Sequence, residues 1–200
     1  YDDFGGALNP RAAMVWNPPG RHTLKLLYGQ AFRAPTLAEL DAQTNPVALG
    51  NDDLDAERLQ SLELNHIFRV NPEWELNQSL FAYRWTDRIQ YVPDAAPATS
   101  LTAQNTGTVK GYGAEISTTW KPAPQWLVEA NYAYAKARDQ RAGQDIGNAP
   151  NHQFYTRFDW AFAPRWSLDA VGQWVGEQQR TPGDNRPEVD DYTMINSTLH

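Results

Sequence analysis

The chain has 200 residues and a formal net charge of −7, so the basic face that nucleic-acid binding needs is not expected. It has no Cys, which excludes a disulfide framework and a thiolate metal site. No stretch approaches the ~20 apolar residues of a membrane helix, and none has the charged start and apolar middle of a secretion signal.

The chain repeats one unit, in which two segments of alternating apolar and polar residues flank a short turn and a longer polar connection follows. Successive side chains of a strand point to opposite faces, so each alternating segment predicts a strand. The predicted strands cover residues 10–16, 22–32, 59–70, 74–91, 112–120, 126–134, 152–162 and 166–174, and a ninth begins near Asp191.

Two local departures from this pattern carry predictions of their own. The apolar phase slips near Leu80 and Phe81, which is typical of a β-bulge. Residues 36–41 and 55–62 each have a composition that favours a short helical turn within a connection.

The segment 152–162 shows the alternation most clearly. One face carries His152, Phe154, Thr156, Phe158, Trp160 and Phe162, and the other carries Gln153, Tyr155, Arg157, Asp159 and Ala161. On a helix these apolar residues would be scattered rather than gathered into a stripe. The charged face needs water, whereas the apolar stripe needs lipid or a protein core. The predicted fold class is therefore all-β.

The lengths of the connections and the positions of the Trp residues indicate whether the apolar stripes face lipid or a protein core. Short turns of three to five residues alternate with long connections at about 33–57, 92–105, 139–151 and 178–190. Five of the eight Trp lie within about two residues of a short turn: Trp16, Trp74, Trp120, Trp126 and Trp166. Short turns, long outer loops and an aromatic girdle are typical of an antiparallel transmembrane β-barrel. The alternative is a soluble sandwich whose core is capped by Trp at one end.

Four sequence motifs, in family order over about residues 7–200, resemble those of TonB-dependent outer-membrane receptors. Residues 28–40, YGQAFRAPTLAEL, are similar to the segment Y-G-x-x-F-R-A-P-x-L-x-E-L, and NDDLDAE at 51–57 resembles N-P-x-L-x-P-E with Asp52 and Ala56 in place of the prolines. NTGTVKGYGAE at 105–115 resembles the strand opening N-x-G-x-x-x-G-x-E, and NAPNH at 148–152 is similar to the strand entry N-x-P-x-H. The resemblance is nearest to siderophore receptors of the ferric-catecholate type.

This resemblance implies a plugged barrel of about 22 strands in the outer membrane of a Gram-negative bacterium, of which this chain supplies about nine. Residues 1–200 would be part of the barrel domain, a fragment that starts at Tyr1 and lacks the plug and the final strands. The implied activity is uptake of an iron–siderophore complex, coupled through the plug to the TonB-ExbB-ExbD complex. Cobalamin or another ligand of such a receptor is the alternative cargo.

Ligand contacts are expected in the long connections. Arg33 follows a strand and can pair with an anionic chelate, or with loop carboxylates such as Glu39 or Asp41. Arg138 and Arg141 flank Asp139 and either bind ligand or keep their loop solvated. Two aromatic residues, Tyr91 and Trp85, are candidates for stacking on a ligand or for an outer aromatic girdle.

No enzyme motif is found, and no catalytic residue, metal site or cofactor is predicted. The four His residues are not at metal-binding spacing, and no Ser lies in G-x-S-x-G. Asp52, Asp53 and Asp55 lack the Gly and Glu that a twelve-residue calcium loop requires. Two further alternatives remain: a soluble β-sheet module that binds carbohydrate through Trp, and an outer-membrane enzyme or adhesin on a smaller barrel.

Overall fold

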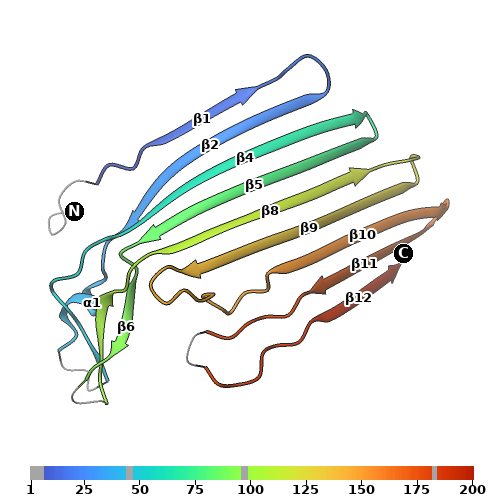
Figure 1. Cartoon of the computed structure of the whole chain (residues 1–200). Coiled ribbons are helices and arrows are strands. Elements are labelled where there is room, and N and C mark those ends of the chain that lie inside the picture. The colour runs from blue at the N-terminus through green and yellow to red at the C-terminus, as the bar shows by residue number, and fades with distance from the viewer. Residues whose placement is uncertain (1–6, 44–46, 96–98, 182–183) are drawn as a thin grey trace.

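The computed structural model describes residues 7–43, 47–95, 99–181 and 184–200, so the predicted fragment start at Tyr1 and parts of three long connections lie outside the described residues. Nine antiparallel strands form one sheet, in the order β1-β2-β4-β5-β8-β9-β10-β11-β12 (Figure 1). Their bounds are β1 Arg11–Trp16, β2 His22–Arg33, β4 Glu57–Asn71, β5 Trp74–Thr86, β8 Val109–Trp120, β9 Trp126–Asp139, β10 His152–Ala163, β11 Trp166–Val175 and β12 Tyr192–Leu199. The nine predicted strands are confirmed.

Short turns join the strands in pairs at one end of the sheet, which we call the turn end. The long connections 34–56, 87–108, 140–151 and 176–191 gather at the opposite end, the loop end (Figure 1). The predicted sorting of connections by length is therefore confirmed. Within the described ranges, no helix is long and apolar enough to cross a membrane.

A second, three-stranded sheet lies at the loop end (Figure 1). It consists of β3 Ala48–Leu49, β7 Leu101–Asn105 and β6 Ile89–Pro93, in that order. Sequence analysis predicted one strand over 74–91, but β5 ends at Thr86 because Asp87 adopts a φ of 57° and turns the chain into β6. Ile89 of β6 and Ala103 of β7 form a small buried core with Leu54, and Leu40 packs against it.

One of the two predicted helical turns is present. The helix α1, Leu37–Asp41, begins at the N-cap Thr36, whose hydroxyl accepts from the Glu39 N–H while the Glu39 carboxylate accepts from the Thr36 N–H. These reciprocal bonds form a capping box. The other prediction, over 55–62, is wrong, because Glu57 begins β4, which pairs with β2 and β5 on either side.

Strand register brings the apolar stripes together on one face of the sheet. Phe158 lies opposite Val128 of β9 and Ala170 of β11, and such paired side chains share a face. Asp159, one position on, faces the other way, opposite Asp169. We call the two sides the apolar face and the polar face. Asp159 and Asp169 are held by Arg157, whose Nε lies 2.9 Å from Asp169 Oδ2.

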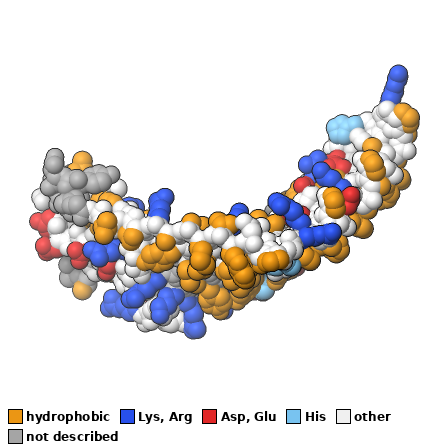
Figure 2. Space-filling view, turned by 90° about the horizontal axis from the view of Figure 1, so that it is seen from above, with side chains coloured by type: hydrophobic (Ala, Val, Ile, Leu, Met, Phe, Trp, Pro, Cys, Tyr) orange, Lys and Arg blue, Asp and Glu red, His pale blue; other side chains and the backbone are white. Residues whose placement is uncertain are grey.

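The apolar face does not pack against a second layer. Leu80 and Ile195 are 56% and 78% exposed, although both lie within strands of the main sheet. Seen from above, the sheet is a single curved wall (Figure 2). Within the described part of the chain, the apolar stripes therefore form no sandwich core, and the soluble-sandwich alternative is wrong.

Trp side chains mark the turn end of the apolar face. Trp74 lies directly opposite Trp120, with ring centroids 6.4 Å apart, and Trp126 lies opposite Trp160 at 5.2 Å. Trp16 is the last residue of β1, beside another short turn. The predicted cluster of indoles at a single end is confirmed, and it is the arrangement expected where a wall meets a membrane–water boundary.

The predicted bulge at Leu80 and Phe81 is wrong, because β5 keeps a continuous register with both neighbours through these residues. Phe81 instead lies opposite Gly113 on the polar face, and Tyr83 lies opposite Gly111. A large ring beside a glycine fills the space that the missing side chain leaves. Aromatic residues on the polar face, rather than a backbone irregularity, thus account for the slip in the apolar phase.

Candidate functional site

The four residues predicted to contact a ligand all lie at the loop end. Arg33 is the last residue of β2, Tyr91 lies in β6, Arg138 is next to the end of β9, and Arg141 lies in the connection that follows. The structure therefore places them on the same rim of the wall. They lie in or beside three different connections.

Arg33 is held by two carboxylates. Its Nη2 and Nε donate to Glu57 at 2.7 and 2.9 Å, and its Nη1 and Nη2 donate to Glu39 at 2.8 and 3.1 Å. The pairing with Glu39 that sequence analysis gave as the alternative role is present, and no ion pair joins Arg33 to Asp41 among the described residues. Direct contact of Arg33 with a ligand stays a prediction.

Hydrogen bonding also fixes the charge of the Glu39 carboxylate. The Arg33 guanidinium holds the pKa of Glu39 below its ordinary value, and the bonds from Thr36 act in the same direction. Glu39 is therefore an anion at neutral pH. Its negative charge lies in the first turn of α1, where the helix end favours it.

Glu57 is the residue that sequence analysis missed. It is only 4% exposed, and besides Arg33 it accepts from Trp85 Nε1 at 3.2 Å and from the Ile89 N–H at 2.8 Å. One carboxylate thus links β2, β4, β5 and β6. Its position at the end of the NDDLDAE motif was visible in the sequence, but its three partners are up to 32 residues away along the chain.

The two aromatic candidates differ in their surroundings. Trp85 lies on the polar face, opposite Leu59 and Val109, so its predicted place in an outer lipid-facing girdle is wrong. Its ring lies under Arg88, with the guanidinium carbon 5.4 Å from the ring centroid. Tyr91 pairs with Ala103 within the small sheet and is 39% exposed, so its side chain is accessible at the rim.

Arg138 and Arg141 belong to one tight loop. Arg138 Nε donates to the Gly143 carbonyl at 3.2 Å, and Asp139 Oδ1 accepts from the backbone N–H groups of Arg141 and Ala142 at 2.8 and 2.9 Å. The Arg141 side chain is exposed and forms no ion pair within the described part of the loop. Ligand contact by either arginine stays a prediction.

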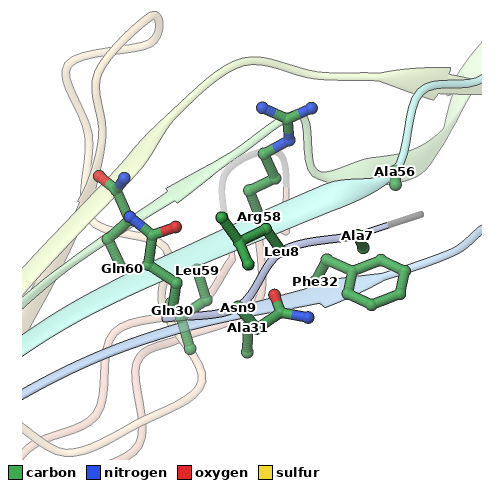
Figure 3. Close-up of a pocket in the computed structure, with 10 residues that line it drawn as sticks. All are labelled: Ala7, Leu8, Asn9, Gln30, Ala31, Phe32, Ala56, Arg58, Leu59 and Gln60. Carbon is green, nitrogen blue, oxygen red and sulfur yellow. The ribbon is translucent and has the colours of Figure 1, made fainter. Parts of the chain in front are cut away.

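A cavity of about 310 Å³ lies where β2 and β4 extend past the short edge strand β1 (Figure 3). Gln30, Phe32, Arg58 and Gln60 supply its larger side chains. None of the four predicted contact residues lines it. Since β1 is an edge of the sheet, the cavity borders the side on which a further strand can pair.

A one-layer antiparallel wall with a lipid-exposed apolar face, a charged opposite face and indoles at the turn end defines part of a transmembrane β-barrel. The family model "TonB dependent receptor-like, beta-barrel" matches residues 1–199. The chain therefore belongs to this family of outer-membrane receptors.

Solved structures with the same fold agree with this assignment. A variant of the ferric enterobactin receptor PfeA of Pseudomonas aeruginosa has a TM-score of 0.81 at 19% identity, over 99% of this chain and 33% of its own. The siderophore receptor PirA of Acinetobacter baumannii has a TM-score of 0.77 at 16% identity, over 96% and 34%. The copper transporter OprC has a TM-score of 0.77 at 16% identity, over 94% and 30%. No curated protein matches the chain.

The chain spans about a third of the length of these solved receptors. Receptors of this family are outer-membrane proteins, and the family is named for its dependence on TonB. The family is one of receptors and transporters rather than enzymes. By the usual arrangement of such barrels, the turn end faces the periplasm and the loop end faces the outside.

Proposed function

We propose that this chain forms part of the wall and of the outer rim of a receptor that takes up an iron–siderophore complex by active transport. Two of the similar solved structures support this cargo, since one is named as a ferric enterobactin receptor and the other as a siderophore receptor. The observation that carries the proposal is the match of PfeA over 99% of the chain, which includes the loop end.

The remainder of the receptor follows from this proposal. Residues 1–200 form part of the barrel domain, and further strands pair with the open edges β1 and β12. A plug domain fills the lumen against the polar face and connects to the TonB-ExbB-ExbD complex. The chain performs no catalysis, so movement of the plug, driven from the inner membrane, releases the cargo.

Arg141 and Tyr91 are the residues that we propose for direct contact with the chelate. Both side chains are exposed on the outer rim, and a guanidinium and a phenol suit an anionic aromatic chelate. Arg138 supports the same loop through Gly143, while its strand position lies on the apolar face. Arg33 is already bound to Glu39 and Glu57, so it holds the rim in shape and offers only the exposed part of its side chain to the ligand.

Growth on defined iron sources tests this proposal. Deletion of the gene should abolish growth on a ferric catecholate as sole iron source, and the intact gene should restore it. The double variant Tyr91→Ala, Arg141→Ala should weaken ferric-catecholate binding about tenfold, which corresponds to about 1.4 kcal/mol. The variant Lys121→Ala, at a short periplasmic turn, serves as the control and should bind normally.

Copper uptake is the second candidate, because OprC, named as a copper transporter, has the same fold over 94% of this chain. Copper accumulation should be measured in the same deletion strain. Normal growth on ferric catecholates together with reduced copper accumulation would replace the siderophore proposal. A growth defect that is corrected only by added cobalamin would replace the siderophore proposal with the cobalamin alternative.

A further inference from the structure

Charges are distributed unequally on the apolar face of the nine-stranded sheet. No strand residue on this face is Asp or Glu, whereas five are Lys or Arg. All five lie on neighbouring strands near the loop end: Arg58 of β4, Arg84 of β5, Lys110 of β8, and Lys136 and Arg138 of β9. We call these five residues the cationic band. Figure 2 shows Lys and Arg side chains gathered beside hydrophobic ones toward the end where the long connections lie.

The strand register places three of these cations in one row. Arg84 lies directly opposite Lys110, and Lys110 lies directly opposite Arg138. Like charges in directly opposed positions destabilise a sheet. This row is therefore unfavourable unless an anion lies between the side chains.

The protein itself supplies little compensation. Arg58, Arg84 and Lys110 are exposed, and their side chains form no hydrogen bond or ion pair with any described residue. The acidic neighbours Glu57 and Asp139 lie on the polar face, and the Arg138 side chain donates to the Gly143 carbonyl rather than to a carboxylate. Arg157 on the polar face, in contrast, is held by Asp159 and Asp169.

The surroundings of the band indicate its height in the membrane. One row closer to the membrane centre lie Leu62, Ala82 and Tyr112, which neighbour one another across β4, β5 and β8, with Lys136 of the band opposite Tyr112. A shallow apolar depression of about 500 Å³ lies further along the same face and is lined by Leu24, Leu64, Leu80 and Ile116, among others. Passing toward the outside, the face thus changes from aliphatic residues, through a mixed row that contains Tyr112 and Lys136, to Arg84, Lys110 and Arg138, as the bilayer changes from hydrocarbon to headgroups.

We propose that the cationic band binds the phosphate groups of a phosphorylated lipid of the outer leaflet. Guanidinium groups bind phosphate through paired hydrogen bonds, and Lys110 and Lys136 add positive charge. The acyl chains of the same lipid lie along the apolar face, in the depression below the band. The band faces away from the lumen, so cargo on the transport path does not reach it.

The test uses the complete receptor, extracted from the outer membrane in a mild detergent and titrated by native mass spectrometry. The probes are bisphosphorylated lipid A, dephosphorylated lipid A and inorganic phosphate. The variant Arg84→Gln, Lys110→Gln should bind the bisphosphorylated lipid at least about tenfold more weakly than the wild type. It should bind the dephosphorylated lipid as the wild type does.

The matched control is Lys121→Gln, Arg165→Gln, which also removes two positive charges but at the turn end. It should bind the bisphosphorylated lipid normally. The conservative variant Arg84→Lys should retain most of the binding, and a β-rich circular dichroism spectrum should show that each variant is folded. Equal binding of both lipids by the wild type, equal loss in the control, or displacement of the lipid by millimolar inorganic phosphate would each overturn the proposal.

Discussion

Glu57 binds Arg33 through two hydrogen bonds, and the two residues lie directly opposite each other where β4 begins and β2 ends. The carboxylate is buried, whereas the arginine side chain is 42% exposed. Because Glu57 also accepts from Ile89 and Trp85, the pair joins the membrane wall to the small sheet at the loop end. The outer rim is therefore built around one carboxylate.

Replacement of this carboxylate should loosen the rim without unfolding the wall. In Glu57→Gln the charge is lost and one acceptor oxygen is replaced by a donor, so we expect a loss of about 1–3 kcal/mol in local stability. Hydrogen exchange at the Ile89 amide should accelerate, while exchange within β10 should not change. The exposed turn residue Glu73 provides the control Glu73→Gln, and equal protection of Ile89 in both variants would contradict this role.

Acid should release α1 from the rim. The pKa of Glu39 is lower in the folded protein than its ordinary value of 4.5. Its stabilising contribution is therefore complete above that value and is lost as the pH falls through the lowered pKa. An acid-active protease should cleave the connection 34–56 faster at about pH 3 than at about pH 6. In Glu39→Gln the cleavage rate should vary much less with pH, and an unchanged pH profile would exclude Glu39 as the group responsible.

A change of charge should reduce stability more on the apolar face of β10 and β11 than on their polar face. Phe158→Arg places a cation on the lipid-exposed face and should reduce the free energy of unfolding in lipid vesicles by about 2–4 kcal/mol near the bilayer midplane. Asp169→Asn, on the polar face, should be mild, since it removes one of two directly opposed carboxylates while Arg157 keeps Asp159. Urea titrations in vesicles measure both. A larger loss in Asp169→Asn would reverse the assignment of faces.

Two glycines of β8 should respond differently to substitution by alanine. A methyl group at Gly113 would collide with the Tyr134 backbone carbonyl oxygen and the Phe81 ring, whereas at Gly111 all the nearest atoms belong to the Tyr83 ring. A ring can move more easily than a paired strand. Gly113→Ala should therefore cost about 1–3 kcal/mol and Gly111→Ala less.

A double-mutant cycle identifies the colliding group. Tyr83→Ala should relieve most of the destabilisation caused by Gly111→Ala, because it removes the ring. Phe81→Ala should relieve little of that caused by Gly113→Ala, because the backbone oxygen remains. Equal relief at both positions, measured by unfolding in vesicles, would show that side-chain crowding alone matters.

The main sheet could be predicted from the sequence because its strands depend on a local pattern. Apolar alternation and short turns lie within each strand pair, so the bounds of β10 and β11 were predicted to within one residue. Two of the errors arose where distant pairing decides the outcome. Residues 57–62 join β4 because β2 and β5 lie on either side, and Phe81 needs no bulge because Gly113 accepts its ring.

The loop end was predicted less well for a related reason. The strand β7 pairs with both β6 and β3, and 40 or more residues of the chain separate β3 from β7. None of these short segments has a repeating pattern. Arg33 and Glu39 were visible as a pair because only six residues separate them. Glu57 was not assigned a role, since its partners come together only after the connections have folded.

Buried hydrophobic side chains are confined to the loop end. Among the described residues the buried hydrophobic side chains are Leu54, Ile89, Ala103, Val109 and Val175, and each lies in a connection, in the small sheet or at the outer end of a strand. The remaining wall has no dry protein interior, so surrounding hydrocarbon must serve as its second layer. Bilayer thickness and acyl-chain packing should therefore govern the wall's resistance to unfolding, whereas the rim should keep its own stability when the lipid is changed.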